Sequence, residues 1–351
     1  MSLLKNGKVS FGVIGCRLGR EHIESAIHDP GMELKAICDI DADRLNNLAR
    51  IFGIESQACY TDYRSLLNQD DIDAVVVATP DLLHEEQTVA ALQAGKHVLC
   101  EKPMALSLEE CRRMIEASKE TGKKLMIGQV VRYTPGAVLA KKLIDSGEIG
   151  ELFYVESEYA HDYAKARGAG DWRVDPRRHP FLGGGCHAVD LLRWIAGNPY
   201  EVFAYANHKV LKNWPVDDCT IAIMKFPREV MGKVFVSIGC KRRYTMRAVF
   251  YGDKGTIILD TLLPYVTIFR AHLVDPIYQN ISESAQTIPV QLDVPVITHN
   301  ISAEMQEFTD ILRENRPVLT DGAQGAATVA ACLAAVQSAQ TGEKTYPIYE
   351  F

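Results

Sequence analysis

Short runs of apolar, largely β-branched residues alternate in the first part of the chain with segments whose apolar residues recur at helical spacing. The runs have the length and the uniform hydrophobicity of strands that are buried on both faces of a sheet. They lie at 9–15, 33–38, 74–78, 97–100 and 125–128, with helical segments at 20–28, between Pro80 and Gly95 and at 107–121, and short elements at 57–60 and 63–67. This alternation predicts an α/β domain with a doubly wound parallel sheet over residues 1–128.

After residue 200 the pattern changes to longer runs in which apolar and polar residues alternate, as they do in antiparallel strands with one buried face. The strands expected here are 152–159, 202–207, 218–226, 231–240, 245–251, 255–260 and 265–269, and the helices are 186–196, 300–314 and 322–340. Residues 271–298 contain three prolines, and we expect them to be irregular, as a lid or an intersubunit arm. Residues 129–351 are therefore predicted to form a second, α+β domain with a large, mostly antiparallel open sheet.

Local signals support several element boundaries. Ser107 and Glu110 have the spacing of a capping box at a helix start. Gly95 suits the left-handed position after a helix. Gly252 and Gly255 enclose Asp253-Lys254, which is a tight hairpin signal.

Composition and charge exclude several classes of protein. The chain has 351 residues and a formal net charge of −7, without the basic stripe of a nucleic-acid-binding protein. No apolar run approaches the ~20 residues of a membrane span, and the N-terminus lacks the pattern of a signal peptide. Nine cysteines occur singly, which predicts neither a zinc cluster nor a disulfide framework. We expect a cytoplasmic protein without a metal site, a nucleic-acid partner or a membrane partner.

The order strand, glycine turn, helix, strand, acid at the start of the chain is that of a dinucleotide-binding unit, the first part of a Rossmann domain. The turn reads Gly15-Cys16-Arg17-Leu18-Gly19, so it lacks the usual middle glycine and is one residue short. Arg17 either compensates by placing its guanidinium beside the phosphates or is simply solvated. Asp39 follows the second strand at the distance expected for the acid that binds the ribose hydroxyls, which favours NAD over NADP.

The strand at 97–100 delivers Glu101, Lys102 and Pro103 at its carboxyl end. Ligands of open α/β sheets bind beyond these ends. Pro103 disfavours the α region for Lys102, so the lysine is expected in a fixed, extended kink. A lysine in this position is a candidate for chemistry.

The run ATPDLLHEEQTVAALQAGKHVLCEKPMALSLEE, with LMIGQVVRYTP, GEIGEL, DWRVDP and GGGCHAVDLLRW, closely resembles the Gfo/Idh/MocA family of NAD(P)-dependent sugar and inositol oxidoreductases. The resemblance covers most of the first half and residues 129–199. It implies that Lys102 lies beside the nicotinamide, that Trp172 and Arg173 lie near the nicotinamide end, and that His187 is the acid/base. Family dehydrogenases commonly carry an aspartate four residues before that histidine, where this chain has Gly183.

The glycine loop and the resemblance together give three sets of candidate residues. The catalytic candidates are Lys102 and His187. The substrate-binding candidates are Lys102, His187 and Arg132, the last of which lies in the segment that joins the two domains. The cofactor-binding candidates are Gly15, Cys16, Arg17, Leu18, Gly19, Asp39, Thr79, Pro80, His84, Glu101, Lys102, Trp172 and Arg173.

Several of these residues also have an ordinary structural interpretation. His187 lies in the first turn of the helix 186–196, where the helix dipole favours the neutral imidazole that a base needs. The alternative is a structural histidine capped by Asp190, and Asp190 itself either orients His187 or holds the helix. His84 opens a helix, so a capping role competes with a cofactor contact.

These observations predict an NAD-dependent dehydrogenase that oxidises a hydroxyl of a sugar, polyol or inositol-like substrate, with NADP the less favoured cofactor. Two alternatives remain. One is a redox-cycling lyase, epimerase or glycosidase with tightly bound NAD, which the missing aspartate favours. The other is a non-catalytic sugar or dinucleotide sensor, against which Lys102 and His187 speak. The resemblance also implies a homodimer or homotetramer formed through the second domain's sheet.

Overall fold

The computed structural model describes residues 7–164, 172–274 and 287–351, which divide into two compact units. The first unit consists of residues 1–130, 300–329 and 349–351, and the second of residues 131–299 and 330–348. The expected division at residue 128 was into two contiguous segments. The structure instead returns the chain to the first unit after residue 299, because the helix that begins at Ile301 packs on the first sheet's helical layer.

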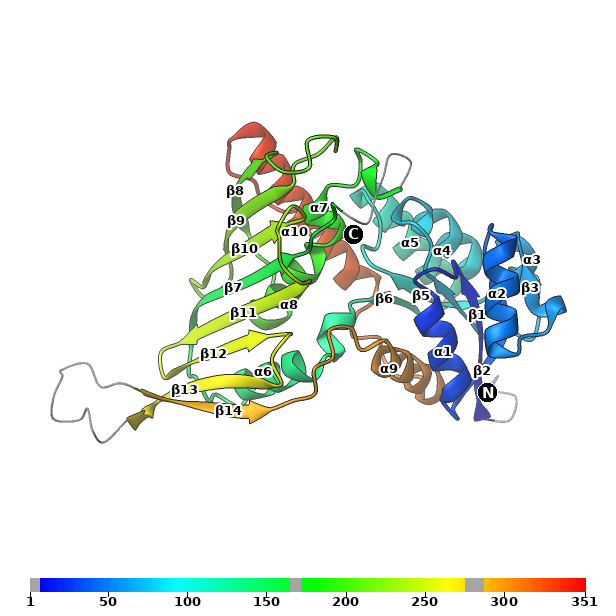
Figure 1. Cartoon of the computed structure of the whole chain (residues 1–351), viewed down its shortest axis with the longest axis horizontal. Coiled ribbons are helices and arrows are strands. Elements are labelled where there is room, and N and C mark those ends of the chain that lie inside the picture. The colour runs from blue at the N-terminus through cyan, green and yellow to red at the C-terminus, as the bar shows by residue number, and fades with distance from the viewer. Residues whose placement is uncertain (1–6, 165–171, 275–286) are drawn as a thin grey trace. The chain divides into compact units, whose positions relative to one another are not determined.

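The first unit contains a parallel sheet of six strands in the order β3-β2-β1-β4-β5-β6, so the α/β prediction is confirmed (Figure 1). Its central strands are buried and rich in valine and isoleucine, as strands covered on both faces must be. The strands are β1 (Val9–Ile14), β2 (Met32–Cys38), β3 (Cys59–Tyr60), β4 (Ala74–Val77), β5 (His97–Glu101) and β6 (Leu125–Gly128). The order of the strands reverses between β1 and β4, and ligands of such sheets bind at this point, beyond the carboxyl ends.

Helices connect these strands, and short-range signals set their ends. The Ser107 and Glu110 capping box is present as predicted, with Glu110 N–H donating to Ser107 Oγ at 3.2 Å. Figure 1 shows α9 beside α1, and the two helices are in contact. The helices are α1 (Arg20–His28), α2 (Ala42–Phe52), α3 (Tyr63–Leu67), α4 (His84–Gln93), α5 (Leu108–Thr121), α9 (Ile301–Glu314) and the first part of α10 (Gly322–Thr341), with 3-10 turns η2 (Ser56–Ala58) and η3 (Asp81–Leu83).

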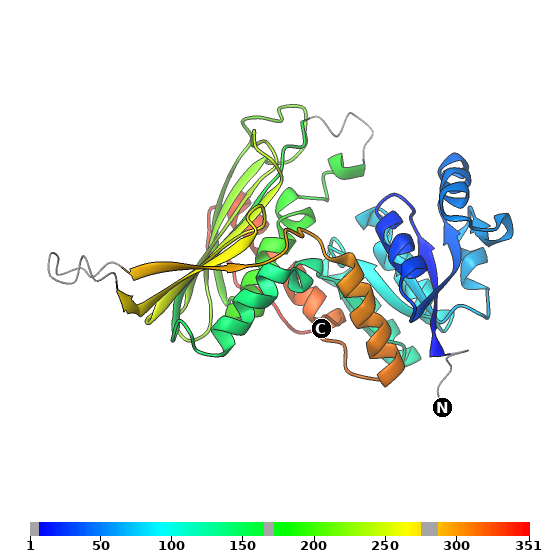
Figure 2. The same cartoon turned by 60° about the horizontal axis from the view of Figure 1, so that its bottom comes forward.

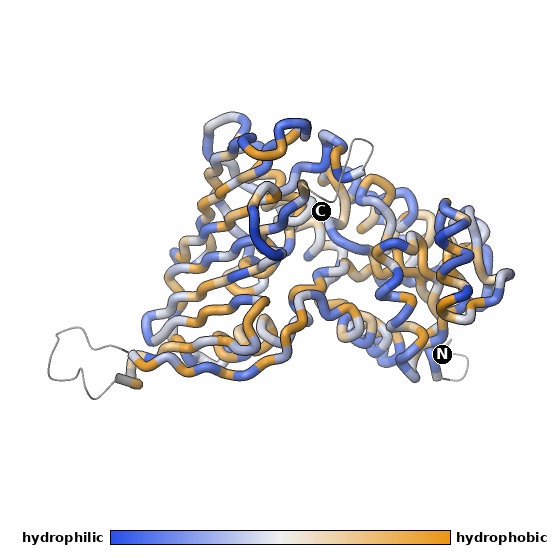
Figure 3. The backbone as a smooth tube through the Cα atoms, in the orientation of Figure 1, coloured by the Kyte–Doolittle hydropathy of each residue, from blue (hydrophilic) through white to orange (hydrophobic). Residues whose placement is uncertain are grey.

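The second unit contains an eight-stranded sheet in the order β14-β13-β12-β11-β7-β10-β9-β8, antiparallel except between β7 and β10. It confirms the predicted mostly antiparallel open sheet. Polar and apolar residues alternate along its strands (Figure 3). The strands are β7 (Leu152–Ala160), β8 (Glu201–Asn207), β9 (Cys219–Lys225), β10 (Met231–Ser237), β11 (Thr245–Gly252), β12 (Gly255–Asp260), β13 (Tyr265–Val274) and β14 (Thr287–Asp293).

Helices of this unit pack on the sheet, α8 against β7 and β10, α7 against β10, and α6 against β12 and β13 (Figure 2). The predicted hairpin is present, with Gly252 paired to Gly255. The helices are α6 (Pro135–Asp145), α7 (Pro180–Gly183), α8 (Cys186–Ala196) and the remainder of α10, with η5 (Trp172–Val174); η4 (Val130–Tyr133) lies where the two units join along the chain.

The prediction that residues 271–298 are irregular was wrong for 271–274 and 287–293 and is confirmed for 294–298. β13 continues to Val274, and Thr287–Asp293 forms β14, which pairs with β13. Pro289 is tolerated because β14 is an edge strand, where a missing backbone N–H costs no ladder bond. The middle of the segment, 275–286, lies outside the described residues.

None of the helices in the part of the chain that the structure describes is both long enough and apolar enough to span a bilayer.

Candidate functional site

The glycine turn after β1 brings its own backbone close to the backbone at the end of β4. Gly15 has φ +89°, and a β-carbon there would lie 2.6 Å from the carbonyl carbon and oxygen of Ala78. Only glycine fits, so the turn passes directly beside the end of β4. Gly19 follows at the start of α1, while the side chains of Arg17 and Leu18 are exposed on the loop. The N–H groups of Gly15, Cys16 and Gly19 donate within the protein, so the loop offers a dinucleotide phosphate the amides of its middle residues and the start of α1 at the sheet edge.

Asp39 lies at the end of β2 and is buried against the same turn. Its Oδ2 accepts the backbone N–H of Cys16 at 2.8 Å, and its Oδ1 accepts the Asp41 N–H at 3.0 Å and the Arg44 guanidinium at 2.7 Å. A carboxylate has about four acceptor sites, so these three bonds leave roughly one for a ribose hydroxyl. The structure thus brings Asp39 to the glycine loop and adds Arg44, which the sequence did not single out.

The loops after β4 and β5 are joined by a buried histidine. His84 contacts the carbonyl oxygens of Thr79 at 3.0 Å and Pro103 at 2.9 Å through its two ring nitrogens, so both nitrogens donate. Burial opposes charging, yet Cys100, Asp81 and the Pro103 carbonyl outweigh it and raise the pKa of His84 to about 10. His84 therefore holds the two loops together, and its direct contact with a cofactor stays a prediction.

Lys102 follows β5 at the same edge of the sheet. Its backbone N–H donates to Glu101 Oε2 at 3.2 Å, its side chain is half-buried, and its peptide bond to Pro103 is cis. Glu101 Oε1 lies 3.4 Å from His22 Nε2 on α1. The carboxyl edge thus gathers Lys102 with the glycine turn, Asp39 and the Thr79-Pro80 segment, all of them predicted from the sequence.

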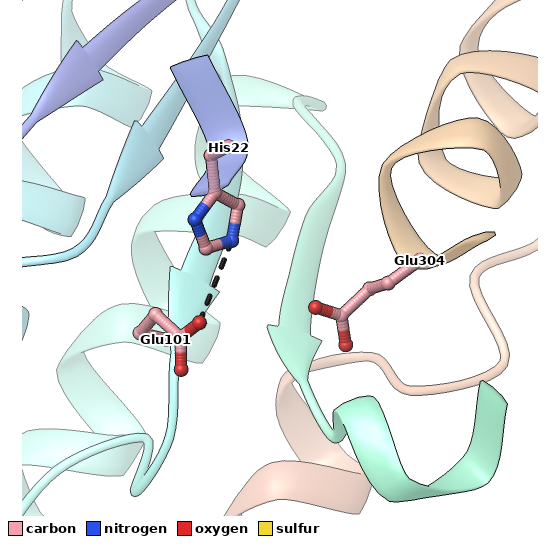
Figure 4. A group of neighbouring side chains, drawn as sticks. All are labelled: His22, Glu101 and Glu304. Carbon is pink, nitrogen blue, oxygen red and sulfur yellow. Dashed lines mark ion pairs between the residues drawn. The ribbon is translucent and has the colours of Figure 1, made fainter. Parts of the chain in front are cut away.

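A third side chain, Glu304 on α9, joins His22 and Glu101. The three offer possible ligand atoms that lie within 4.8 Å of one another, and all three residues are buried (Figure 4). No other group of three or more histidine, cysteine or acidic residues within the described parts of the chain comes this close. The sequence predicted no metal site, and it gave no signal for Glu304, which comes from a distant helix.

In the second unit, His187 is buried in the first turn of α8 among aromatic rings. Its ring stacks on Tyr159, with centroids 6.3 Å apart and an interplanar angle of 25°, and it meets His299 edge-on at 5.4 Å. Tyr159 Oη lies 2.9 Å from Tyr163 Oη. Burial first, and then the neighbouring tyrosines, raise the pKa of Tyr159 well above its usual value. The surroundings thus fix the plane of the His187 imidazole.

Asp190 binds arginines on two elements. It accepts two hydrogen bonds of 2.7 Å from Nε and Nη2 of Arg132, and Arg193 Nη1 lies 3.5 Å away. Removing one partner of a buried pair costs about 3–5 kcal/mol, so this pair anchors α8. The structure favours the helix-holding role for Asp190, and substrate binding by Arg132 stays a prediction.

Trp172 and Arg173 lie in the short turn η5. The guanidinium carbon of Arg173 is 4.3 Å from the Trp172 ring centroid, and that of Arg178 is 4.8 Å from it. Arg178 is buried, and its charge opposes the rise in the pKa of Tyr159. Arg178 is therefore a further charged group in the part of the second unit that holds His187.

Gly183, where the resemblance implies an aspartate, lies against Arg178. A β-carbon at this position would be 2.3 Å from Cζ of Arg178 and 2.5 Å from both terminal nitrogens, so any side chain would displace the guanidinium. Gly184 is restricted in the same way by the Tyr159 ring, at 2.5 Å. The chain thus places a cation where the family's carboxylate would begin.

Two family models match the chain. Residues 9–129 match "Oxidoreductase family, NAD-binding Rossmann fold". Residues 138–258 match "GFO/IDH/MocA C-terminal domain". The matches fall on the parallel sheet with its helices and on the larger part of the second sheet.

Individual proteins are similar over most of their length. The inositol 2-dehydrogenase of Salmonella typhimurium strain LT2 is 30% identical over 262 residues, 74% of each chain. Inositol 2-dehydrogenase 2 of Saccharopolyspora erythraea is 28% identical over 340 residues, 95% of this chain and 94% of that protein. A solved levoglucosan dehydrogenase in complex with NADH superposes with a TM-score of 0.84 at 23% identity, covering 97% of this chain and 99% of that one, and so shares the fold.

Proposed function

Because this chain belongs to the GFO/IDH/MocA family of oxidoreductases with an NAD-binding Rossmann domain, we propose that it is an NAD-dependent dehydrogenase for the CH–OH group of a sugar, polyol or inositol-like substrate. The observation that carries the proposal is the gathering of the glycine turn, Asp39 and Lys102 at the carboxyl edge of one parallel sheet. The relatives named inositol 2-dehydrogenase support the substrate class.

The residues at this edge suit the cofactor. The loop that begins at Gly15 leads into the start of α1, which suits a phosphate, and Asp39 keeps an acceptor site for a ribose hydroxyl. Thr79, Pro80 and Glu101 come from the next two strand ends, and Trp172 and Arg173 are proposed for the nicotinamide end. NAD, when bound, accepts the hydride.

The proposal gives Lys102 and His187 complementary roles at the substrate hydroxyl. Lys102 stabilises the alkoxide that develops as the hydride leaves. His187, a buried imidazole in the first turn of α8, takes the hydroxyl proton. We propose that Arg132 contributes to substrate binding in two ways. It holds α8 through Asp190, and its guanidinium can contact the substrate with the donors that do not bind Asp190.

We also propose that the protein is a cytoplasmic homodimer or homotetramer that uses the outer face of its eight-stranded sheet. All nine cysteines are free thiols, six of them buried, which suits a reducing compartment.

The first experiment is oxidation of myo-inositol and a panel of polyols and aldoses, followed by NADH absorbance, with wild-type protein, Lys102→Met and His187→Asn. Each variant is expected to lose at least ~100-fold in kcat, the usual contribution of a positioned acid or base, while the NAD affinity of His187→Asn stays within threefold. Because residues that act as one unit are not additive, the double variant should lose little more than the worse single variant.

Other outcomes identify the alternatives. A protein that co-purifies with NAD and turns over substrate without net formation of NADH would be a redox-cycling enzyme. The Arg178 guanidinium beside Gly183, where the family's aspartate would begin, favours this alternative. If the wild type turned over none of the compounds tested and both variants still bound one of them, the protein would be a sensor.

A further inference from the structure

Glu304 is a fully buried acid to which none of the described residues donates a hydrogen bond. Its side chain is on α9 and is 0% exposed, and within the described residues neither carboxylate oxygen accepts a hydrogen bond. Figure 4 shows the carboxyl group pointing toward His22 and Glu101, at the place where the three side chains converge. An ionised carboxylate buried without donors is far more costly than a protonated one.

We propose that Glu304 is a neutral carboxylic acid whose proton is shared with the Glu101 carboxylate, directly or through one water molecule, and that this buried proton positions Lys102. The inference rests on the proposed function for the role of Lys102. The proton itself does not depend on that role, because it follows from the burial and convergence of the three side chains.

The charges on the surrounding elements agree with one proton at this place. α1 contributes Glu21 and His22, the end of β5 contributes Glu101 and Lys102, and α9 contributes Glu304. Burial and then the Glu101 charge raise the pKa of Glu304 well above its usual value, and Lys102 only partly opposes them. Burial lowers the pKa of His22, so the imidazole stays neutral and does not replace the proton.

A bound divalent cation suits the site less well. Three side chains converge, so such an ion would need water molecules for its remaining ligands in this buried place. Lys102 is close enough for its charge to act on Glu304, and it would repel a second cation. One oxygen of Glu101 already accepts the Lys102 backbone N–H. A proton needs no further ligand and leaves that bond intact.

The buried proton influences the position of Lys102 through Glu101. Because Glu101 Oε2 holds the Lys102 backbone N–H at 3.2 Å, any displacement of this carboxylate moves the backbone that carries the lysine. An ionised Glu304 would set two buried carboxylates against each other and push Glu101 away. Glu304 is thus a positioning residue.

The decisive variant is Glu304→Gln, which keeps the shape and the donor of the neutral acid but cannot ionise. A carboxyl with a raised pKa in the folded state stabilises below its unfolded pKa, and this stability is lost as pH rises through the folded pKa. At pH 4 the wild type and Glu304→Gln should therefore have the same equilibrium constant of unfolding. Between pH 4 and pH 9 this constant should rise in the wild type by a factor at least ten times larger than in Glu304→Gln. Chemical denaturation at each pH measures this, and Glu304→Ala, which leaves a cavity, should be destabilised at every pH.

Three further measurements decide the outcome. The infrared C=O band of a protonated carboxylic acid at pH 7 should be present in the wild type and absent in Glu304→Gln; its presence in both would contradict the proposal.

Mg²⁺, Mn²⁺ or Zn²⁺ is then added after EDTA treatment. If one of these ions stabilised the wild type but not Glu304→Gln, the site would hold a cation in place of the proton. The alkaline limb of the kcat profile should move to higher pH in Glu304→Gln, and an unmoved limb would overturn the positioning role. Denaturation and infrared readouts need no substrate, so they separate this inference from the proposed dehydrogenase activity.

Discussion

At the scale of single residues, cofactor preference depends on how Asp39 and Arg44 are paired. Asp39 repels a 2′-phosphate and also engages the Arg44 guanidinium at 2.7 Å. In Asp39→Ala that guanidinium keeps its ion pair with Asp41 at 3.0 Å but loses Asp39, so part of it becomes available to a 2′-phosphate. We expect the ratio of NAD to NADP affinity to fall by about tenfold or more, since a charge-assisted hydrogen bond contributes about 1.5–3 kcal/mol.

The measurement is calorimetric titration of each variant with both dinucleotides. Asp39→Ala combined with Arg44→Ala is the matched control and should lose the gained NADP affinity. An equal loss of affinity for both cofactors in Asp39→Ala would show that Asp39 only holds the Cys16 turn.

Helix propensity predicts that alanine at position 183 stabilises the protein, whereas the contact between Gly183 and Arg178 predicts that it destabilises the protein. Gly183 ends α7, where alanine would ordinarily stabilise by about 0.5–1 kcal/mol. Because a β-carbon would lie 2.3 Å from the guanidinium carbon, Gly183→Ala should instead lower the thermal midpoint and reduce kcat/KM.

A double-mutant cycle tests the cause of that loss. Gly183→Ala should cost less in an Arg178→Ala background, with an interaction energy of about 0.5–3 kcal/mol. If the two losses simply add, Arg178 is not what excludes a side chain from position 183.

At the scale of elements, the pairing of β5 with β6 should be sensitive to acid. His97 Nδ1 accepts the Lys124 N–H at 3.0 Å and must be neutral to do so. Burial, with Lys123 and Lys124, lowers the pKa of His97 to about 4. A group with a depressed pKa contributes stability above its unfolded value, near 6.5, and that stability is lost as pH falls toward 4.

We expect hydrogen exchange of β6 amides to accelerate between pH 6.5 and pH 4, after correction for the intrinsic rate. His97→Asn offers an acceptor that does not titrate and should remove this acceleration. Equal pH dependence in both proteins would place the acid-sensitive group elsewhere, for instance at His179, whose pKa burial also lowers to about 4.

Sequence patterns predicted several elements from local signals. The capping box at Ser107 and the hairpin at Gly252 depend on neighbouring residues only, and both are present. Helix α2 was missed although its signal is local too: Asp41 caps its start, Gly53 ends it, and Leu45 and Leu48 have helical spacing.

At the scale of the whole molecule, the sequence predicted the parts of the site that lie on consecutive strands of one sheet. Gly15, Asp39 and Lys102 each follow a buried strand, and the parallel arrangement brings such ends to one edge. Glu304 and Arg178 had no such signal. Glu304 depends on α9 returning from a distant part of the chain to the first unit, and the contact of Arg178 with Gly183 depends on how a short turn folds back on itself, neither of which periodicity encodes.

The outer face of the eight-stranded sheet carries the last prediction. α8 packs against β7 and β10, and the side chains on the opposite face of β8, β9 and β10 include large exposed apolar groups: Tyr205 at 67%, Ile221 at 38%, Ile223 at 50% and Met231 at 54%. Tyr205 lies directly opposite Ile221 in the β8–β9 register and Ile223 follows on the same face of β9, so these three groups adjoin, while Met231 lies opposite Lys225. Contiguous apolar surface of this kind marks an interaction site.

We expect the wild type to sediment as a dimer or tetramer and the variant Ile223→Lys with Tyr205→Ala to sediment at a lower mass. Two charges introduced on the paired copies would be buried without partners, which opposes association. Leu319→Lys, which changes an apolar residue of similar exposure in the first unit, is the matched control and should leave the mass unchanged. A wild-type protein that stays monomeric at micromolar concentration would refute this interface, and a variant that keeps its mass would place the interface on another face.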